Sequence, residues 1–123
     1  MSSFDSKIIS QLPAATKEFS NAQPFGIVKV SDDGTIQMYN NWEAEMAGVA
    51  VKDAEGKNFF TQVAPCTNNR LVHGKFKDGV AKGELDTEFN YTFTYRMKPT
   101  NVVLRLVRDS RTKSNFVLVA KKN

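Results

Sequence analysis

Hydrophobic and polar residues alternate along the C-terminal third of the chain. From Phe89 to Tyr95 every second residue is aromatic, within a segment that runs from Thr87 to Met97. The same period of two returns after a turn at Lys98–Thr100 and again near the C-terminus. The apolar positions are Phe89, Tyr91, Phe93 and Tyr95, then Val102, Leu104 and Leu106, then Phe116, Leu118 and Ala120. Because strand side chains point alternately to two faces, this pattern predicts three strands.

Two shorter strands are predicted nearer the N-terminus. Phe25–Val30 and Thr35–Asn40 flank an Asp33–Gly34 pair, which is suited to a tight hairpin turn. The last three strands are also joined by short turns, so neighbouring strands should run in opposite directions. The five segments together predict a central five-stranded antiparallel sheet.

A short helix is predicted directly after the second strand. Asn40 or Asn41 can cap it by accepting a backbone N–H bond, and Gly48 is a natural end. The helix would cover residues 42–47. The following residues, up to the third strand, contain short irregular or helical structure and one longer helix.

The longer helix is predicted over roughly residues 69–82. Apolar residues four apart share one of its faces, and Gly83 marks its end. These apolar residues are Val72, Phe76 and Val80. Helices on one face of an antiparallel sheet make an α+β fold, and we expect a single domain.

The first 24 residues are predicted to form a small N-terminal cap on a core of residues 25–123. Apolar residues fall at helical spacing here, at Ile8, Leu12, Ala15 and Phe19. Pro13 interrupts the pattern, which favours two short helices over one long helix. A frayed tail is the alternative that the pattern leaves open.

Composition places the chain among ordered globular proteins. It has 123 residues, of which 41% are hydrophobic and 24% charged, enough for one modest core. It contains no apolar run near the roughly 20 residues of a membrane span and no evident leader, so we expect a cytoplasmic protein without membrane contact. The net charge is +4, but basic residues are scattered among acids, which argues against nucleic-acid binding.

The single cysteine is the main candidate for chemistry. One cysteine excludes an internal disulfide, and with one histidine the chain has too few ligands for a structural zinc site. Cys66 is then a small buried residue, a nucleophile or an attachment point. A cysteine enzyme would need a base, and His73 is the only histidine available.

Tyr39 and Glu43 are a second candidate pair. They lie four residues apart, across the end of a strand and the first turn of a helix. Each is a hydrogen-bond donor when protonated, so together they could hold a ligand oxygen. The alternative is a buried tyrosine beside a solvated glutamate.

Four segments carry a resemblance to a known family. They are MYNNWEAE, GKNFFTQVAPCT, HGKFKDGVAKGEL and YTFTYRMKPT. In order and spacing they resemble photoactive yellow protein, a family of blue-light photoreceptors with the PAS fold. The resemblance extends from about Phe25 to the C-terminus and is loose before it.

The resemblance implies which residues hold a chromophore. In the family a cysteine, here Cys66, carries p-coumaric acid (4-hydroxycinnamic acid) through a thioester, and its backbone N–H holds the thioester carbonyl. A tyrosine and a glutamate, which fall on Tyr39 and Glu43, hold the phenolic oxygen. The other chromophore-binding positions that it implies are Ala47, Val49, Pro65, Thr67, Phe93, Tyr95 and Met97.

The implied function is that of a blue-light receptor and not of an enzyme. Light would isomerise the chromophore from trans to cis, Glu43 would give it a proton, and the cap of residues 1–24 would loosen until thermal recovery. Burial should keep Glu43 protonated in the dark, because it disfavours the charged form. We expect a monomer that signals to a partner protein whose identity the sequence does not give. A light-independent PAS module that binds a ligand or a partner is the alternative.

Three positions depart from the family pattern. Ala47 replaces a threonine whose hydroxyl supports the tyrosine, Val49 replaces an arginine over the pocket, and Trp42 replaces a small residue. Without a cation at position 49, we expect greater solvent access near the chromophore. Met97 matches a methionine that assists the return to trans, although a plain core methionine has the same pattern.

Overall fold

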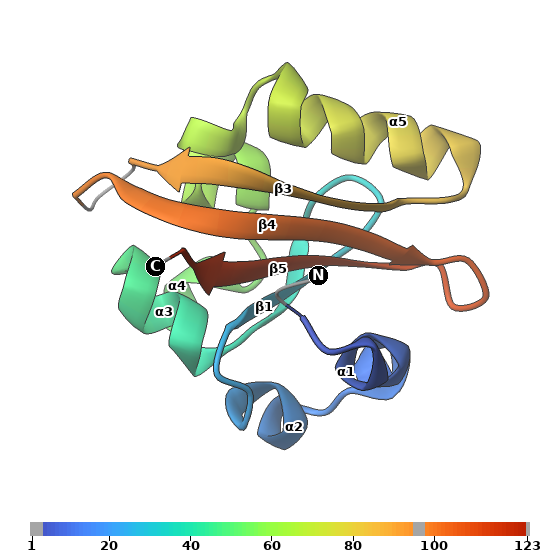
Figure 1. Ribbon diagram of the computed structural model, residues 1–123, viewed down its shortest axis with the longest axis horizontal. Coiled ribbons are helices and arrows are strands. Elements are labelled where there is room, and N and C mark those ends of the chain that lie inside the picture. The colour runs from blue at the N-terminus through green and yellow to red at the C-terminus, as the bar shows by residue number, and fades with distance from the viewer. Residues whose placement is uncertain (1–3, 95–97, 123) are drawn as a thin grey trace.

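A five-stranded antiparallel sheet forms the centre of the protein (Figure 1). The computed structural model describes residues 4–94 and 98–122. The strands are β1 (Gly26–Val30), β2 (Ile36–Tyr39), β3 (Asp86–Phe93), β4 (Thr100–Asp109) and β5 (Ser114–Lys121). Their order is β2-β1-β5-β4-β3, so the first strand in sequence lies beside the last. The predicted α+β fold with an antiparallel sheet is confirmed.

Short helices precede β1 and connect β2 to β3. The α-helices are α1 (Ser6–Gln11), α2 (Lys17–Asn21), α3 (Asn41–Ala47), α4 (Val51–Ala54) and α5 (Lys75–Lys82). Single turns are η1 (Leu12–Ala14) and η3 (Pro65–Thr67), which are 3-10 turns, and η2 (Phe59–Val63) and η4 (Arg70–Gly74), which are π turns. Within the described ranges, no helix has the length and apolar character needed to cross a membrane.

Helix boundaries follow the capping signals in the sequence. The Asn40 side chain accepts a bond from the backbone N–H of Glu43, and Gly48 ends α3 with a φ of 72°. The helix predicted over roughly residues 69–82 is helical from Arg70 to Lys82. It opens with the wider π turn η4, which Asn69 caps by accepting from the backbone N–H of Val72. Strand β3 ends at Phe93, before the predicted end at Met97. Residues 95–97, and with them Tyr95 and Met97, lie outside the described residues.

The two faces of the sheet bury separate sets of side chains. Val28 and Val117 point to the face that packs against Phe59, Phe76 and the other residues between β2 and β3. Their neighbours in sequence point to the opposite face, because the strand period is two. There Ile27, Phe116 and Leu118 pack with Phe4 and Leu12 of the N-terminal segment.

The N-terminal segment therefore covers the face of the sheet opposite to α5. Figure 1 shows α1 and α2 grouped near β1, whereas α5 lies beyond β3. Leu12 is buried, and Ile8 and Ala15 pack around it, as their helical spacing suggests. Pro13 lies in η1, so the break that it predicts between two short helices is present.

Asn40 joins this segment to α3. Its side chain is 1% exposed, and its amide nitrogen donates to the carbonyl oxygens of Ser20 (2.8 Å) and Phe25 (2.9 Å). Its amide oxygen accepts from the backbone N–H groups of Ile27 (3.0 Å) and Glu43 (3.1 Å). One buried side chain thus connects the end of α2, the start of β1 and the first turn of α3.

Replacing Asn40 by alanine should destabilise the protein by roughly 3 kcal/mol, because it removes a helix cap and leaves buried backbone groups without partners. Urea unfolding measures this change. Asn41→Ala, at the exposed neighbouring position, is the matched control and should change the free energy of unfolding by well under about 1 kcal/mol. Equal effects of the two substitutions would contradict the role given to Asn40.

Candidate functional site

Tyr39 and Glu43 come together on the face of the sheet that packs against α5, because β2 ends where the capped helix α3 begins. Tyr39 is the last residue of β2, and Glu43 lies in the first turn of α3. Their side chains are 2% and 1% exposed. The Tyr39 hydroxyl and Glu43 Oε1 are buried without a hydrogen-bond partner among residues 4–94 and 98–122. The alternative of a solvated Glu43 is therefore wrong, and Glu43 is buried.

The segment that carries Cys66 is held by its own side chains. Asn58 accepts bonds from the backbone N–H groups of Phe60 (3.0 Å) and Thr61 (3.1 Å), which fixes the start of η2. The Thr67 hydroxyl donates to the carbonyl oxygen of Ala64 at 2.6 Å and closes the turn η3. Cys66 lies within this turn, half-buried and with a free thiol.

The site is a small hollow where these elements meet. Its volume is about 10 Å³. It is lined by Tyr39, Glu43, Ala47, Val63, Ala64, Cys66 and Phe93. The space matches one water molecule, so an aromatic ligand requires the lining side chains to move apart. The structure does bring the predicted attachment residue and the predicted donor pair to one place.

The electrostatics of the hollow favour two protonated donors. Burial raises the pKa of Glu43 to about 8, so the carboxyl group is neutral at pH 7. Burial, and to a lesser extent the neighbouring Glu43, raises the pKa of Tyr39 above its ordinary value. Unpaired buried donors are each unfavourable by roughly 1–3 kcal/mol. A ligand oxygen that accepts from both would remove this penalty, and an anionic oxygen would do so best.

Gly26 is a site residue that the sequence reasoning missed. A Cβ atom at Gly26 would overlap Glu43 Oε1 and would lie 3.2 Å from the Trp42 ring. Only glycine therefore lets the Glu43 carboxyl lie against β1. A glycine inside a strand signals a close approach, and that signal was available at position 26.

The remaining predicted residues occupy different places. Phe93 and Ala47 line the hollow. Val49 is buried in the core and does not line the hollow, while Pro65 and Thr67 form the turn around Cys66. The other two predicted chromophore-binding residues, at positions 95 and 97, lie outside the described residues.

His73 is not placed as a base for Cys66. Its Nδ1 lies 3.0 Å from Asn68 Oδ1, and its ring stacks on Phe60 with centroids 4.5 Å apart. Within the described ranges, no hydrogen bond joins His73 to Cys66. His73 is therefore not hydrogen-bonded to Cys66 as a general base would be.

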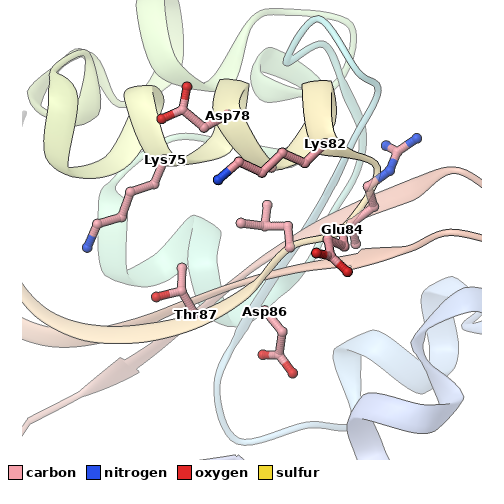
Figure 2. Close-up of a pocket in the computed structure, with 9 residues that line it drawn as sticks. Lys75, Asp78, Lys82, Glu84, Asp86 and Thr87 are labelled. Carbon is pink, nitrogen blue, oxygen red and sulfur yellow. The ribbon is translucent and has the colours of Figure 1, made fainter.

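A larger and more open groove lies between α5 and β3 (Figure 2). Its volume is about 700 Å³. It is lined by Lys75, Asp78, Gly79, Lys82, Glu84, Leu85, Asp86, Thr87 and Arg108. Its charges are mixed in sign, and Cys66, Tyr39 and Glu43 are not among its residues. Size alone does not make it the functional site.

Comparison with known proteins agrees with the fold. No protein-family profile matches the chain. It is 40% identical over 95 residues to photoactive yellow protein from Rhodothalassium salexigens, covering 77% of this chain and 76% of that protein. It is 39% identical over 99 residues to the protein of that name from Halochromatium salexigens, covering 80% and 79%.

A solved structure gives the same result. The photoactive yellow protein domain of the sensor histidine kinase Ppr from Rhodospirillum centenum superposes with a TM-score of 0.85 at 33% identity, over 91% of this chain and 98% of that domain. The antiparallel sheet with its connecting helices is thus a PAS domain, a sensory module. The chain belongs to the photoactive yellow protein family.

The stability of the chromophore-free protein should fall as pH rises from about 5 to 8. The Glu43 carboxyl ionises near pH 4.5 in the unfolded chain but near 8 in the folded one, so the folded state binds the extra proton in this window. The contribution of Glu43 to the free energy of unfolding should decrease by roughly 4 kcal/mol, since one proton per pH unit is equivalent to about 1.4 kcal/mol. Burial lowers the pKa of His73, which acts in the opposite direction in this window. Urea titrations across this range measure the slope.

Glu43→Gln should flatten this pH dependence, because the amide does not titrate. Glu45→Gln, at an exposed position of the same helix, should keep the slope of the unmodified protein. Equal slopes for all three proteins would show that Glu43 is already ionised in the folded state.

Proposed function

We propose that this protein is a blue-light photoreceptor that carries p-coumaric acid as a thioester on Cys66. One observation carries the proposal. Cys66 shares a hollow with two buried donors, Tyr39 and Glu43, that have no acceptor in the described part of the chain. The relatives named photoactive yellow protein support it.

Attachment is an acyl transfer to the Cys66 sulfur. The thiol loses its proton to solvent, the sulfur–carbonyl bond forms, and the bond from that carbonyl to its leaving carboxylate breaks when the acyl donor is an anhydride. When bound, the group supplies a phenolate conjugated to a thioester carbonyl, which absorbs blue light and isomerises from trans to cis. Cys66 is half-buried and lines the hollow.

Tyr39 and Glu43 stabilise negative charge on a ligand oxygen in the hollow. A buried anion is unfavourable unless donors satisfy it. Hydrogen bonds to an anionic acceptor are roughly twice as strong as neutral ones, so the two O–H groups favour the phenolate. Glu43 is thus a donor in the dark and holds a proton in reserve.

Proton loss from Glu43 is the switch. It leaves a carboxylate that is 1% exposed and forms no ion pair within the described ranges. An unpaired buried charge is unfavourable by several kcal/mol, comparable with the 5–15 kcal/mol that stabilises a domain. Hydration of the site relieves this, and it requires α3 to move.

Asn40 passes that movement to the N-terminal segment. It caps α3 through Glu43 and holds Ser20 and Phe25 through its amide nitrogen. A displaced α3 therefore loosens the cap of residues 1–24 and uncovers the outer face of the sheet. We infer that this form signals to a partner protein, as a cytoplasmic monomer and without catalysis of its own.

Mixing the apoprotein with p-coumaric anhydride should give a visible yellow band that bleaches under a blue flash and recovers in darkness. Cys66→Ser should give neither the band nor the mass gain of one p-coumaroyl group. Absorbance and intact-protein mass measure both. A folded apoprotein with a free thiol that stays colourless would overturn the proposal and favour a light-independent PAS ligand-binding module.

In the loaded protein, Glu43→Gln should shift the visible band to longer wavelength and suppress cap release. An amide is a weaker donor than a carboxylic acid and has no proton to give at this step. Hydrogen exchange of residues 6–21 in darkness and under blue light measures cap release, with Glu45→Gln as the matched control. An unchanged band together with normal light-induced exchange would remove Glu43 from the mechanism.

A further inference from the structure

The carbonyl oxygen of Cys66 accepts hydrogen bonds from two side chains that do not line the hollow. The Tyr91 hydroxyl of β3 donates to it at 2.5 Å, and Asn69 Nδ2 donates to it at 3.2 Å. Asn69 Nδ2 also donates a hydrogen bond to the Tyr91 hydroxyl oxygen at 2.7 Å. The three groups form a closed arrangement on one peptide oxygen.

The same peptide group is held at its other end. The backbone N–H of Thr67 donates to the carbonyl oxygen of Ala64 at 2.8 Å. The peptide plane between Cys66 and Thr67 is therefore fixed on both sides, by β3 through Tyr91 and by its own turn through Ala64. A plane held on both sides cannot rotate without breaking a hydrogen bond.

Asn69 and Tyr91 are themselves held. Asn69 Oδ1 accepts from the backbone N–H of Val72 at 3.1 Å, which caps η4. The Tyr91 ring lies edge-on to Phe93, with centroids 6.1 Å apart and an interplanar angle of 81°, and Phe93 lines the hollow. Strand β3 thus contacts both the hollow and the peptide that carries the sulfur.

The hydrogen bonds from Tyr91 and Asn69 to the Cys66 carbonyl are not needed to close the turn. Thr67 and Asn58 already close the segment with their own side chains. The Tyr91 hydroxyl adds a bond from an edge strand, directed at the one residue of the turn that bears a thiol. The bond restrains the main-chain carbonyl of the residue that carries the thiol.

We propose that Tyr91 and Asn69 are positioning residues that hold the Cys66 peptide rigid, so that Sγ faces the hollow and the attached end of its ligand stays fixed. The inference rests on the proposed function. With the attached end fixed, a change in ligand shape acts at the opposite end, on Tyr39 and Glu43. With the peptide loose, part of that change is taken up by rotation of the Cys66–Thr67 plane.

Tyr91→Phe removes the hydroxyl alone and tests this on the chromophore-free protein. Exchange of the Thr67 amide hydrogen and reaction of Cys66 with Ellman's reagent should both accelerate, by about tenfold for the loss of one hydrogen bond. Asn69→Asp keeps the oxygen that caps η4 but removes the donor, and should act in the same direction. Thr92→Val is the matched control, since its hydroxyl donates to Asn101 at 2.9 Å and not to the turn.

In the loaded protein, the yield of bleaching per absorbed photon tests the positioning role, because a change in protein stability alone would not alter it. Tyr91→Phe should lower the yield of bleaching per absorbed photon by several fold, while Thr92→Val leaves it unchanged. Unchanged Thr67 exchange and thiol reactivity in Tyr91→Phe, or a bleaching yield equal to that of the unmodified protein, would overturn the inference. A chain that never becomes yellow would overturn the proposed function instead, and the apoprotein measurements would still decide whether Cys66 is held by Tyr91.

Discussion

The burial of the Glu43 carboxyl group is the constraint on which the rest of the site depends. A carboxyl group that is 1% exposed and has an oxygen without a partner among the described residues is tolerated only while neutral. That requirement explains the raised pKa, and Gly26 supplies the space against β1. The removal of one proton from Glu43 consequently converts a tolerated neutral carboxyl group into an unfavourable buried carboxylate.

In the proposed mechanism, Asn40 gives the ionisation of Glu43 a route to the opposite face of the sheet. Glu43 and the hollow lie on the face that packs against α5, whereas the N-terminal segment covers the other face. The hydrogen-bonded sheet between the two faces is rigid, and its backbone hydrogen bonds do not change with the charge of Glu43. Asn40 lies where β1 begins and bonds to groups on both sides of that point. Asn40 therefore joins α3 to the N-terminal segment through hydrogen bonds.

Local patterns predicted the elements well, because their causes are local. The period of two in β3 to β5, the break at Pro13 and the caps at Asn40 and Gly48 each depend on a few neighbouring residues. Tertiary contacts could not be predicted in this way. The bond from Tyr91 to the Cys66 carbonyl joins residues 25 apart in sequence, and the π turn at η4 has no periodic signature.

The site residues likewise divide into those that local sequence patterns predict and those that they do not. Composition alone treats a glutamate as exposed, so the burial of Glu43 followed from the family resemblance and not from the pattern. Ala47 affects the hydrogen bonding of Tyr39. It lines the hollow directly, and its methyl group offers no bond to the Tyr39 hydroxyl. In the described chain that hydroxyl has no protein acceptor, so a ligand oxygen would become its partner. The orientation of Tyr39, and with it the order of the hollow, then depends on the bound ligand more strongly than in a site with a hydroxyl at position 47.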